Sequence, residues 1–225
     1  TALTTTLTKA ASVTSQKLGQ PFDWQLTPAA ATNPNTLFLN NFAITDTLPA
    51  QFELQSVFTG TGYANSPAGN FITLRYQTTA NPSFTTWTGG PFAANQTLNV
   101  SALGLGAGVY ITVVEINYGT VRGDFAASAT ASNKPRLTGV INSPARNGDI
   151  IADNTVITNL NTTLDSTFGG SPVTQATASA PLTNTTFKIK PNSVKTVESG
   201  YFVPGGTVAF QVETWNDSTS EAAIL

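Results

Sequence analysis

The side chains that could do chemistry in this sequence are amines, carboxylates, carboxamides and hydroxyls. The chain has 225 residues and contains no His, no Cys and no Met. Soft-metal sites, thiol chemistry, disulfides and Ser-His-Asp triads are therefore excluded. Among the acids, Asp46 and Glu115 could be imagined as a pair for glycoside hydrolysis. No aromatic-rich motif beside them indicates a sugar cleft, however, and we expect no enzyme.

Binding chemistry has little support in the sequence. Asp149, Asp153 and Asp165 are too dispersed for an EF-hand-type loop, so we expect no metal site and no cofactor, although a Ca²⁺ ion held between loops stays open. Residues 122–124 spell Arg-Gly-Asp, the integrin-binding tripeptide, but the surrounding strand pattern explains the glycine as a bulge or turn. The 10 Lys and Arg residues form no basic patch, so we expect no nucleic-acid partner.

The composition indicates a folded chain with an unusually uncharged surface. Charged residues make up 10% of the chain, against about 25% in ordinary soluble domains. Thr (38), Asn (19) and Ser (16) together make up about a third of the chain. The hydrophobic content of 40% is enough for a core and argues against disorder. No apolar run approaches the roughly 20 residues of a membrane span.

Alternating residues predict the elements that must position these side chains. Residues 22–26 (FDWQL), 72–76 (ITLRY) and 208–212 (VAFQV) alternate between apolar and polar, as half-buried strands do. Turn clusters such as residues 65–69 (NSPAG) separate these runs, and no stretch of ten or more residues has the apolar spacing of a helix. The sequence therefore predicts an all-β chain folded as an antiparallel β-sandwich.

An internal repeat organises the chain. Residues 8–26 align without a gap on residues 194–212, so that Lys9 falls on Lys195 and Trp24 on Phe210. In this alignment Leu225 corresponds to Leu39, so we expect a second copy that this chain does not finish. The predicted organisation is a sandwich at 1–160, a linker or extra strand pair at 161–185, and an incomplete second repeat at 186–225.

A short motif carries a resemblance to a known family. Residues 43–50, AITDTLPA, resemble the TDTLP signature of the Ig-like repeat domain of Gram-positive bacterial surface proteins, the domain-of-unknown-function family eleven, which is related to collagen-adhesin-type isopeptide domains. Residues 8–35 follow the family's order of a Lys-bearing strand, a Gly turn and an alternating strand, and residues 149–158 are similar to its closing strand. The resemblance spans most of residues 3–160 and restarts near 186. It implies an extracellular Ig-like β-sandwich.

The same resemblance implies a covalent cross-link. Some relatives join a Lys amine to an Asn carboxamide beside a buried acid, because burial favours the neutral, nucleophilic amine. By motif position the candidates here are Lys9, Asp46 and Asn154, with Glu115 as an alternative acid. The alternatives are that Lys9 extends its amine to solvent, that Asp46 caps a turn, and that Asn154 bonds a sheet edge.

The expected function is structural. We expect a subunit of an extracellular filament on a bacterial cell or spore. The incomplete repeat at 186–225 would pack on the next copy, and repetition of this head-to-tail contact generates an open fibre. The partner would be a second copy of the chain, no host receptor is indicated, and strand addition would use free edges in 186–225. The alternatives are a stalk fragment of a larger surface adhesin and a viral capsid or tail protein. The expected inter-subunit contact residues are Phe187, Ile189, Val208, Phe210, Val212 and Trp215.

Overall fold

The described part of the chain consists of two units built from β-strands. The computed structural model describes residues 2–30, 33–185, 191–199 and 203–216, which divide into a first unit, 1–185, and a second unit, 186–225. The helices in this part of the chain are two short 3₁₀ turns, Val100–Leu103 and Ala131–Asn133. The prediction of an all-β, sandwich-type fold is confirmed.

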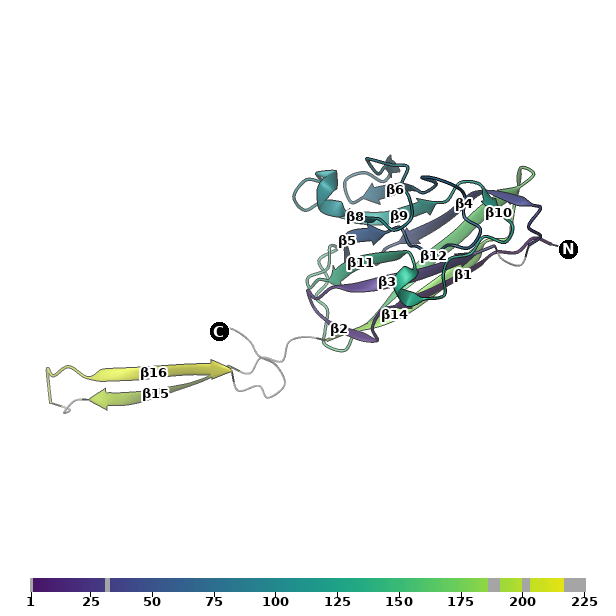
Figure 1. The fold of residues 1–225 in the computed structure, drawn as a ribbon. Coiled ribbons are helices and arrows are strands. Elements are labelled where there is room, and N and C mark those ends of the chain that lie inside the picture. The colour runs from purple at the N-terminus through teal and green to yellow at the C-terminus, as the bar shows by residue number, and fades with distance from the viewer. Residues whose placement is uncertain (1, 31–32, 186–190, 200–202, 217–225) are drawn as a thin grey trace. The chain divides into compact units, whose positions relative to one another are not determined.

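One face of the first unit is a five-stranded antiparallel sheet, called here the front sheet (Figure 1). Its strands, in spatial order, are β1 (Thr6–Ala11), β3 (Phe22–Ala29), β11 (Arg136–Ile141), β5 (Phe52–Phe58) and β8 (Thr97–Asn99). The first strand of the chain, β1, is therefore an edge strand that pairs with β3 alone.

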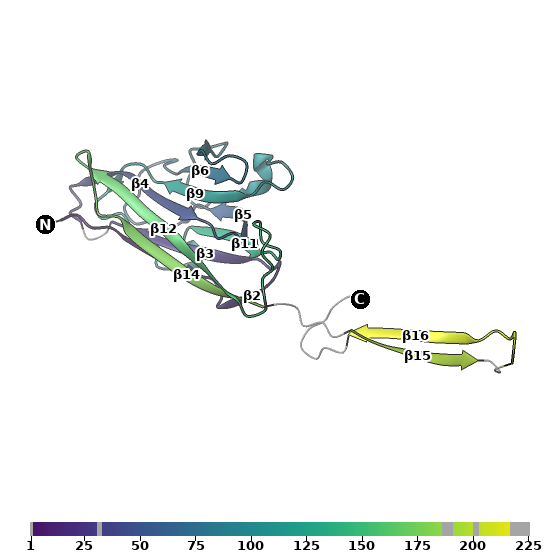
Figure 2. The same cartoon turned by 180° about the vertical axis from the view of Figure 1, so that it is seen from behind.

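The opposite face is a larger sheet, called here the back sheet, which Figure 2 shows from its own side. All its main pairings are antiparallel except that of β2 with β14. In spatial order it contains β2 (Ser15–Lys17), β14 (Ala176–Thr185), β12 (Val156–Phe168), β4 (Phe38–Thr47), β9 (Ile111–Asn117), β6 (Thr73–Thr78) and β7 (Thr85–Thr86), while β10 (Val121–Arg122) pairs with β4 and β13 (Ser171–Pro172) with β12.

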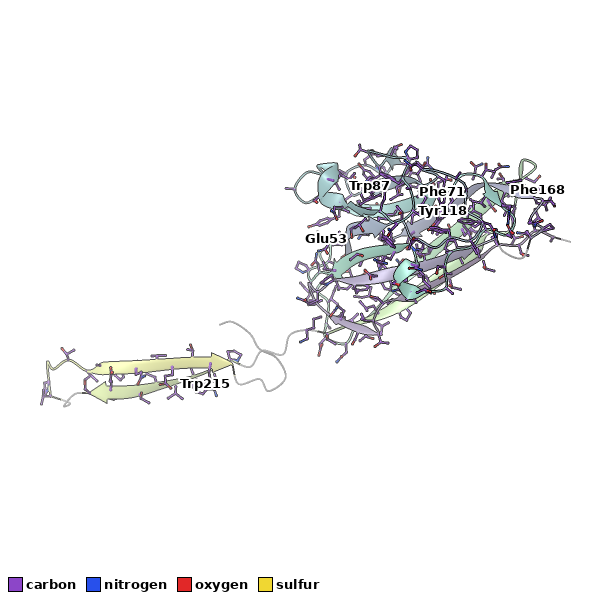
Figure 3. The ribbon with its side chains drawn as sticks, viewed as in Figure 1. Glu53, Phe71, Trp87, Tyr118, Phe168 and Trp215 are labelled. Carbon is purple, nitrogen blue, oxygen red and sulfur yellow. The ribbon has the colours of Figure 1, made fainter. Side chains whose placement is uncertain are left out.

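Aromatic and aliphatic side chains from both sheets fill the space between them. On β3, Phe22, Trp24 and Leu26 all point inward and are buried, as the period-two pattern predicts. The Trp24 ring lies 4.9 Å from that of Phe22 and packs edge-on against it. Further along the core, the Tyr118 and Phe71 rings lie 6.3 Å apart (Figure 3). Each large apolar side chain buried in this way contributes roughly 1.5–3 kcal/mol.

Residues 161–185 belong to the sandwich. Strand β12 runs through residue 160, where a domain boundary was predicted, and pairs with β4 on one side and β14 on the other. Of the two alternatives for 161–185, the structure has the strand pair. The predicted boundary at residue 160 is wrong, since it falls inside β12. The sequence does not reveal this strand, because its inward positions include the polar residues Asn159, Thr162 and Ser166 and so show no apolar alternation.

The second unit contains a hairpin of two antiparallel strands, β15 (Pro191–Ser199) and β16 (Ala209–Asn216). Its pairing repeats that of β1 with β3: Lys9 lies opposite Leu26, and Lys195 lies opposite Val212. All six residue pairs of β1 and β3 recur in β15 and β16 at the offset of 186 residues. The internal repeat is thus a repeat of strand register.

Candidate functional site

The side chain of Lys9 crosses the interior of the first unit from the front sheet to the back sheet. It projects inward from β1 and has no exposed surface. Its Nζ donates hydrogen bonds to Oδ2 of Asp46 on β4 and to Oγ1 of Thr162 on β12, both at 2.7 Å. The amine also lies 5.3 Å from the centre of the Trp24 ring. The alternative in which Lys9 extends its amine to solvent is therefore wrong.

Burial changes the protonation equilibrium of this amine. The pKa of Lys9 is lowered from its ordinary value because removal from water disfavours the ammonium form. The charge of Asp46 and its hydrogen bond act in the opposite direction, but the effect of burial is the larger. A lowered pKa makes the neutral amine, which is the nucleophilic form, more accessible near neutral pH.

Asn159 on β12 is a residue that the sequence analysis missed. It is fully buried, and in the described structure neither Oδ1 nor Nδ2 of its carboxamide has a hydrogen-bond partner. Leaving a buried polar group unpaired costs about 1–3 kcal/mol, so native structures contain few of them. A buried carboxamide with both ends unpaired therefore calls for a specific explanation.

The strand register places Asn159 at the inward position of β12 next to Thr162, the residue that accepts a hydrogen bond from Lys9. The register shift in β12 falls between Asn159 and Thr162, and the two residues between them are exposed, so these two side chains occupy consecutive inward positions. Thr162 accepts the Lys9 hydrogen bond directly. On the neighbouring strand β14, Ala180 is the residue that pairs with Asn159. Ala180 and Lys9 line the same surface depression.

Unpaired polar atoms are concentrated at this site. In the described residues, seven buried side-chain nitrogen and oxygen atoms have no hydrogen-bond partner. Four of the seven belong to the cluster around Lys9: Oδ1 of Asp46, Oδ1 and Nδ2 of Asn159, and Nε1 of Trp24. The cluster thus combines a buried amine, a buried acid and a buried carboxamide, which are the three groups that an amide-forming transfer needs.

Two of the predicted site residues lie elsewhere. Asn154 is exposed in the turn before β12, with a φ of 60° and its carboxamide 3.4 Å from Asp153, and the structure does not bring it to Lys9. Glu115 is on β9, where it pairs with Thr45 of β4, while its neighbour Val114 pairs with Asp46. Because adjacent strand positions face opposite sides, Glu115 lies on the side of the back sheet opposite to Asp46. It forms a two-pronged ion pair with Arg75, at 2.8 and 2.7 Å.

The Arg-Gly-Asp tripeptide is engaged within the fold. The Arg122 guanidinium donates to both carboxylate oxygens of Asp124, at 2.5 and 2.7 Å, and to Asn65 at 2.6 Å.

In the described ranges, no group of three acidic, His or Cys side chains is placed to hold a metal ion. No helix in this part of the chain has the length and apolar character that crossing a membrane requires.

The residues expected to contact another subunit lie in the second unit. Phe187 and Ile189 lie outside the described residues. Val208 is half-buried, while Phe210 and Val212 are 51% and 60% exposed. Trp215, labelled on β16 in Figure 3, is 36% exposed. The register of the hairpin puts Phe210 and Val212 on one face and Trp215 on the other.

Fold and site together define an antiparallel β-sandwich in which the buried amine of Lys9 meets a buried acid of the opposite sheet, and a buried carboxamide lies at the next inward position of that sheet. No protein-family model matches the chain, and no curated protein matches its sequence.

Proposed function

We propose that the first unit is a structural module of an extracellular bacterial surface protein, related to the Ig-like repeat domains of Gram-positive bacteria, and that an amide bond between Lys9 and Asn159 joins its two sheets. The observation that carries this proposal is the buried pair of Lys9 and Asp46 beside a carboxamide with no hydrogen-bond partner. Asn159 takes the role that the family resemblance implied for Asn154.

The proposed reaction is a transfer of an acyl group between two nitrogen atoms. The neutral Nζ of Lys9 attacks Cγ of Asn159, a bond forms between these atoms, and the bond from Cγ to Nδ2 breaks. Asp46 accepts a proton from the attacking amine and returns one to the leaving nitrogen, which departs as ammonia. The reaction needs no oxidant and no cofactor, and the product keeps an N–H where Lys9 already meets Asp46.

The cross-link would suit a protein that carries load outside a cell. It would tie the edge strand β1, which backbone hydrogen bonds join to β3 alone, to β12 in the interior of the back sheet. Because the sequence has no Cys, no disulfide can fill this role. An amide also survives reduction, and the chain has no Met or Cys to oxidise.

The test of the cross-link is the mass of the intact chain, measured after denaturation. Loss of one ammonia lowers the mass by about 17 Da relative to the sequence. We expect this loss in the unmodified chain, and we expect fragmentation of a protease digest to identify one branched peptide that contains both Lys9 and Asn159.

Four variants test the assignment. Lys9→Ala and Asn159→Ala each remove a reacting group and should show the full sequence mass for the altered chain. Asp46→Ala should do the same or react far more slowly, because the proton carrier is missing. Asn154→Ala is the matched control and should keep the loss. A full sequence mass for the unmodified, folded chain would rule out the bond.

The assembly of the module has two candidate forms. The first is a filament in which the second unit of one copy packs on the next copy, so that repetition of one contact builds a fibre. The second is the stalk of a surface adhesin made of tandem modules, which the identical register of the two hairpins favours. Electron microscopy of the purified chain separates them, because regular fibres support the filament and dispersed single particles support the stalk.

A further inference from the structure

The hairpin β15–β16 exposes side chains on both faces. Every residue of β15 is exposed, and so are Phe210 and Val212 on β16. Two-stranded hairpins are marginally stable in water unless a further layer covers an apolar face. The described residues of the second unit contain no further strand that could supply this layer.

The first unit shows what covers a hairpin of this kind. Hairpin β1–β3 has the same register, and its inward face is formed by Lys9, Trp24 and Leu26. The back sheet covers that face, with Asp46 of β4 and Thr162 of β12 as the partners of the Lys9 amine.

The second hairpin has a face of matching chemistry. Lys195, Phe210 and Val212 stand at the positions of Lys9, Trp24 and Leu26. Lys195 holds its amine 4.2 Å from the centre of the Phe210 ring, as Lys9 does over Trp24 at 5.3 Å. Val197 and Val208 extend the same apolar face at the positions of Ala11 and Phe22.

We propose that hairpin β15–β16 docks on an antiparallel sheet built like β14–β12–β4, which presents a buried Asp and a buried Asn from neighbouring strands and has no first hairpin of its own. Lys195 then forms a second amide with that Asn. The proposal rests on the cross-link proposed for Lys9. A Lys in the middle of an apolar face is costly to bury without an acid opposite it, and this requirement specifies the partner's chemistry.

The bond would form as in the first unit. The Lys195 Nζ attacks Cγ of the partner's Asn side chain, the bond from that carbon to its amide nitrogen breaks, and ammonia leaves after receiving a proton through the partner's Asp. The product is a covalent joint between the hairpin and the sheet that receives it. No other reactant takes part.

The test uses the back sheet of this chain as the probe. The acceptor is the full chain with Lys9→Ala and Lys195→Ala, which keeps Asp46 and Asn159 but lacks the lysines of both repeats. The Lys195 donor is the full chain with Lys9→Ala and Asn159→Ala. The Lys9 donor, which is the matched control, carries Lys195→Ala and Asn159→Ala and offers the native hairpin instead.

Acceptor and donor are unfolded and refolded together, and the products are weighed after denaturation. The acceptor's own hairpin competes at a high effective concentration, but the covalent step is irreversible, so even rare exchange accumulates product. The denaturant concentration is chosen as the one at which the Lys9 donor yields a covalent dimer. Under that condition we expect the Lys195 donor to yield a dimer whose mass is about 17 Da below the sum of the two chains.

The outcomes are distinct. A dimer with the Lys195 donor, absent when Lys195 is also replaced by Ala, supports the proposal. A dimer with the Lys9 donor alone means that hairpin β15–β16 does not fit such a sheet, and overturns it. If the unmodified chain shows no loss of ammonia, the cross-link proposed for Lys9 fails, and that result is read from the single chain without any dimer experiment.

Discussion

The hairpins β1–β3 and β15–β16 are two copies of one local structure in different surroundings. Both place a Lys across from an aliphatic residue and over an aromatic ring, and both use a glycine with positive φ before the second strand: Gly19 at 74° and Gly205 at 82°. Their burial differs completely, since the Lys9 side chain is inaccessible to solvent and all of β15 is exposed.

This difference separates what the hairpin encodes from what the sheet opposite it supplies. Alternation, turn glycine and register are local properties, and the second unit has them although its described residues contain no sheet that covers the hairpin. The lowered pKa of Lys9 is not a local property, because it comes from burial beneath the back sheet. The proposed reactive site therefore belongs to the pair of sheets, and the hairpin contributes one of its three groups.

The largest expected effect comes from removing the cross-link in the first unit. In Asn159→Ala the bond cannot form, and the unfolded chain regains the freedom of a loop of about 150 residues. By the chain-entropy treatment used for disulfides, this costs about 5 kcal/mol of unfolding free energy. Chemical denaturation of the variant and the unmodified chain, followed by tryptophan fluorescence, measures the difference.

The control for this prediction is Asn154→Ala, whose side chain is exposed. We expect its unfolding free energy to fall by no more than about 1–2 kcal/mol, because Ala at the φ of 60° that Asn154 adopts is strained, and this is well below the effect of Asn159→Ala. Equal loss of stability in both variants would contradict a special role for Asn159.

The next effect compares equivalent positions of the two hairpins. Leu26 is fully buried and Val212 is 60% exposed, although they face the Lys of their own repeat in the same register. Leu26→Ala should cost about 2–5 kcal/mol through lost packing and a cavity. Val212→Ala should change the unfolding free energy of the chain by no more than about 0.5 kcal/mol. A large loss with Val212→Ala would show that the second hairpin is already covered in solution.

Much of this architecture follows from the sequence. The alternation of residues 22–26 gave the buried row of β3, and the ungapped alignment of Lys9 with Lys195 gave a repeat that the strand register reproduces. The prediction that Lys9 and Asp46 belong together also agrees with their ion pair. The first two predictions depend on short residue patterns, and the third depends on the order of motifs in the family that the chain resembles.

The proposed acceptor, Asn159, could not be found in this way. Asn154 and Asn159 are five positions apart in a segment rich in Thr and Asn, so composition does not distinguish them. The choice depends on where β12 begins, at Val156, and on the register shift that turns both Asn159 and Thr162 inward. A shift of this kind reverses which side chains face the core, and the sequence of β12 has no apolar alternation to reveal it.

The smallest expected effect is the contribution of Lys9 to the dependence of stability on pH, which only the uncross-linked chain has. In Asn159→Ala, Lys9 remains a free amine whose pKa is lower in the folded than in the unfolded state. Between these two pKa values the unfolded state binds more protons, so stability rises with pH in that window, below the ordinary value of 10.5. In the cross-linked chain Lys9 is an amide and does not titrate.

The measurement is the difference in unfolding free energy between Asn159→Ala and the unmodified chain over a pH series. Tyr63 and Tyr118 have raised pKa values because they are buried, so they lower stability as the pH rises above about 10. Because both chains contain these tyrosines, their contribution cancels in the difference. We expect the stability gap to narrow as the pH rises toward 10.5. A gap that stays constant with pH would mean that Lys9 titrates in both chains or in neither. The two chains would then not differ in whether Lys9 is a free amine, which contradicts the cross-link.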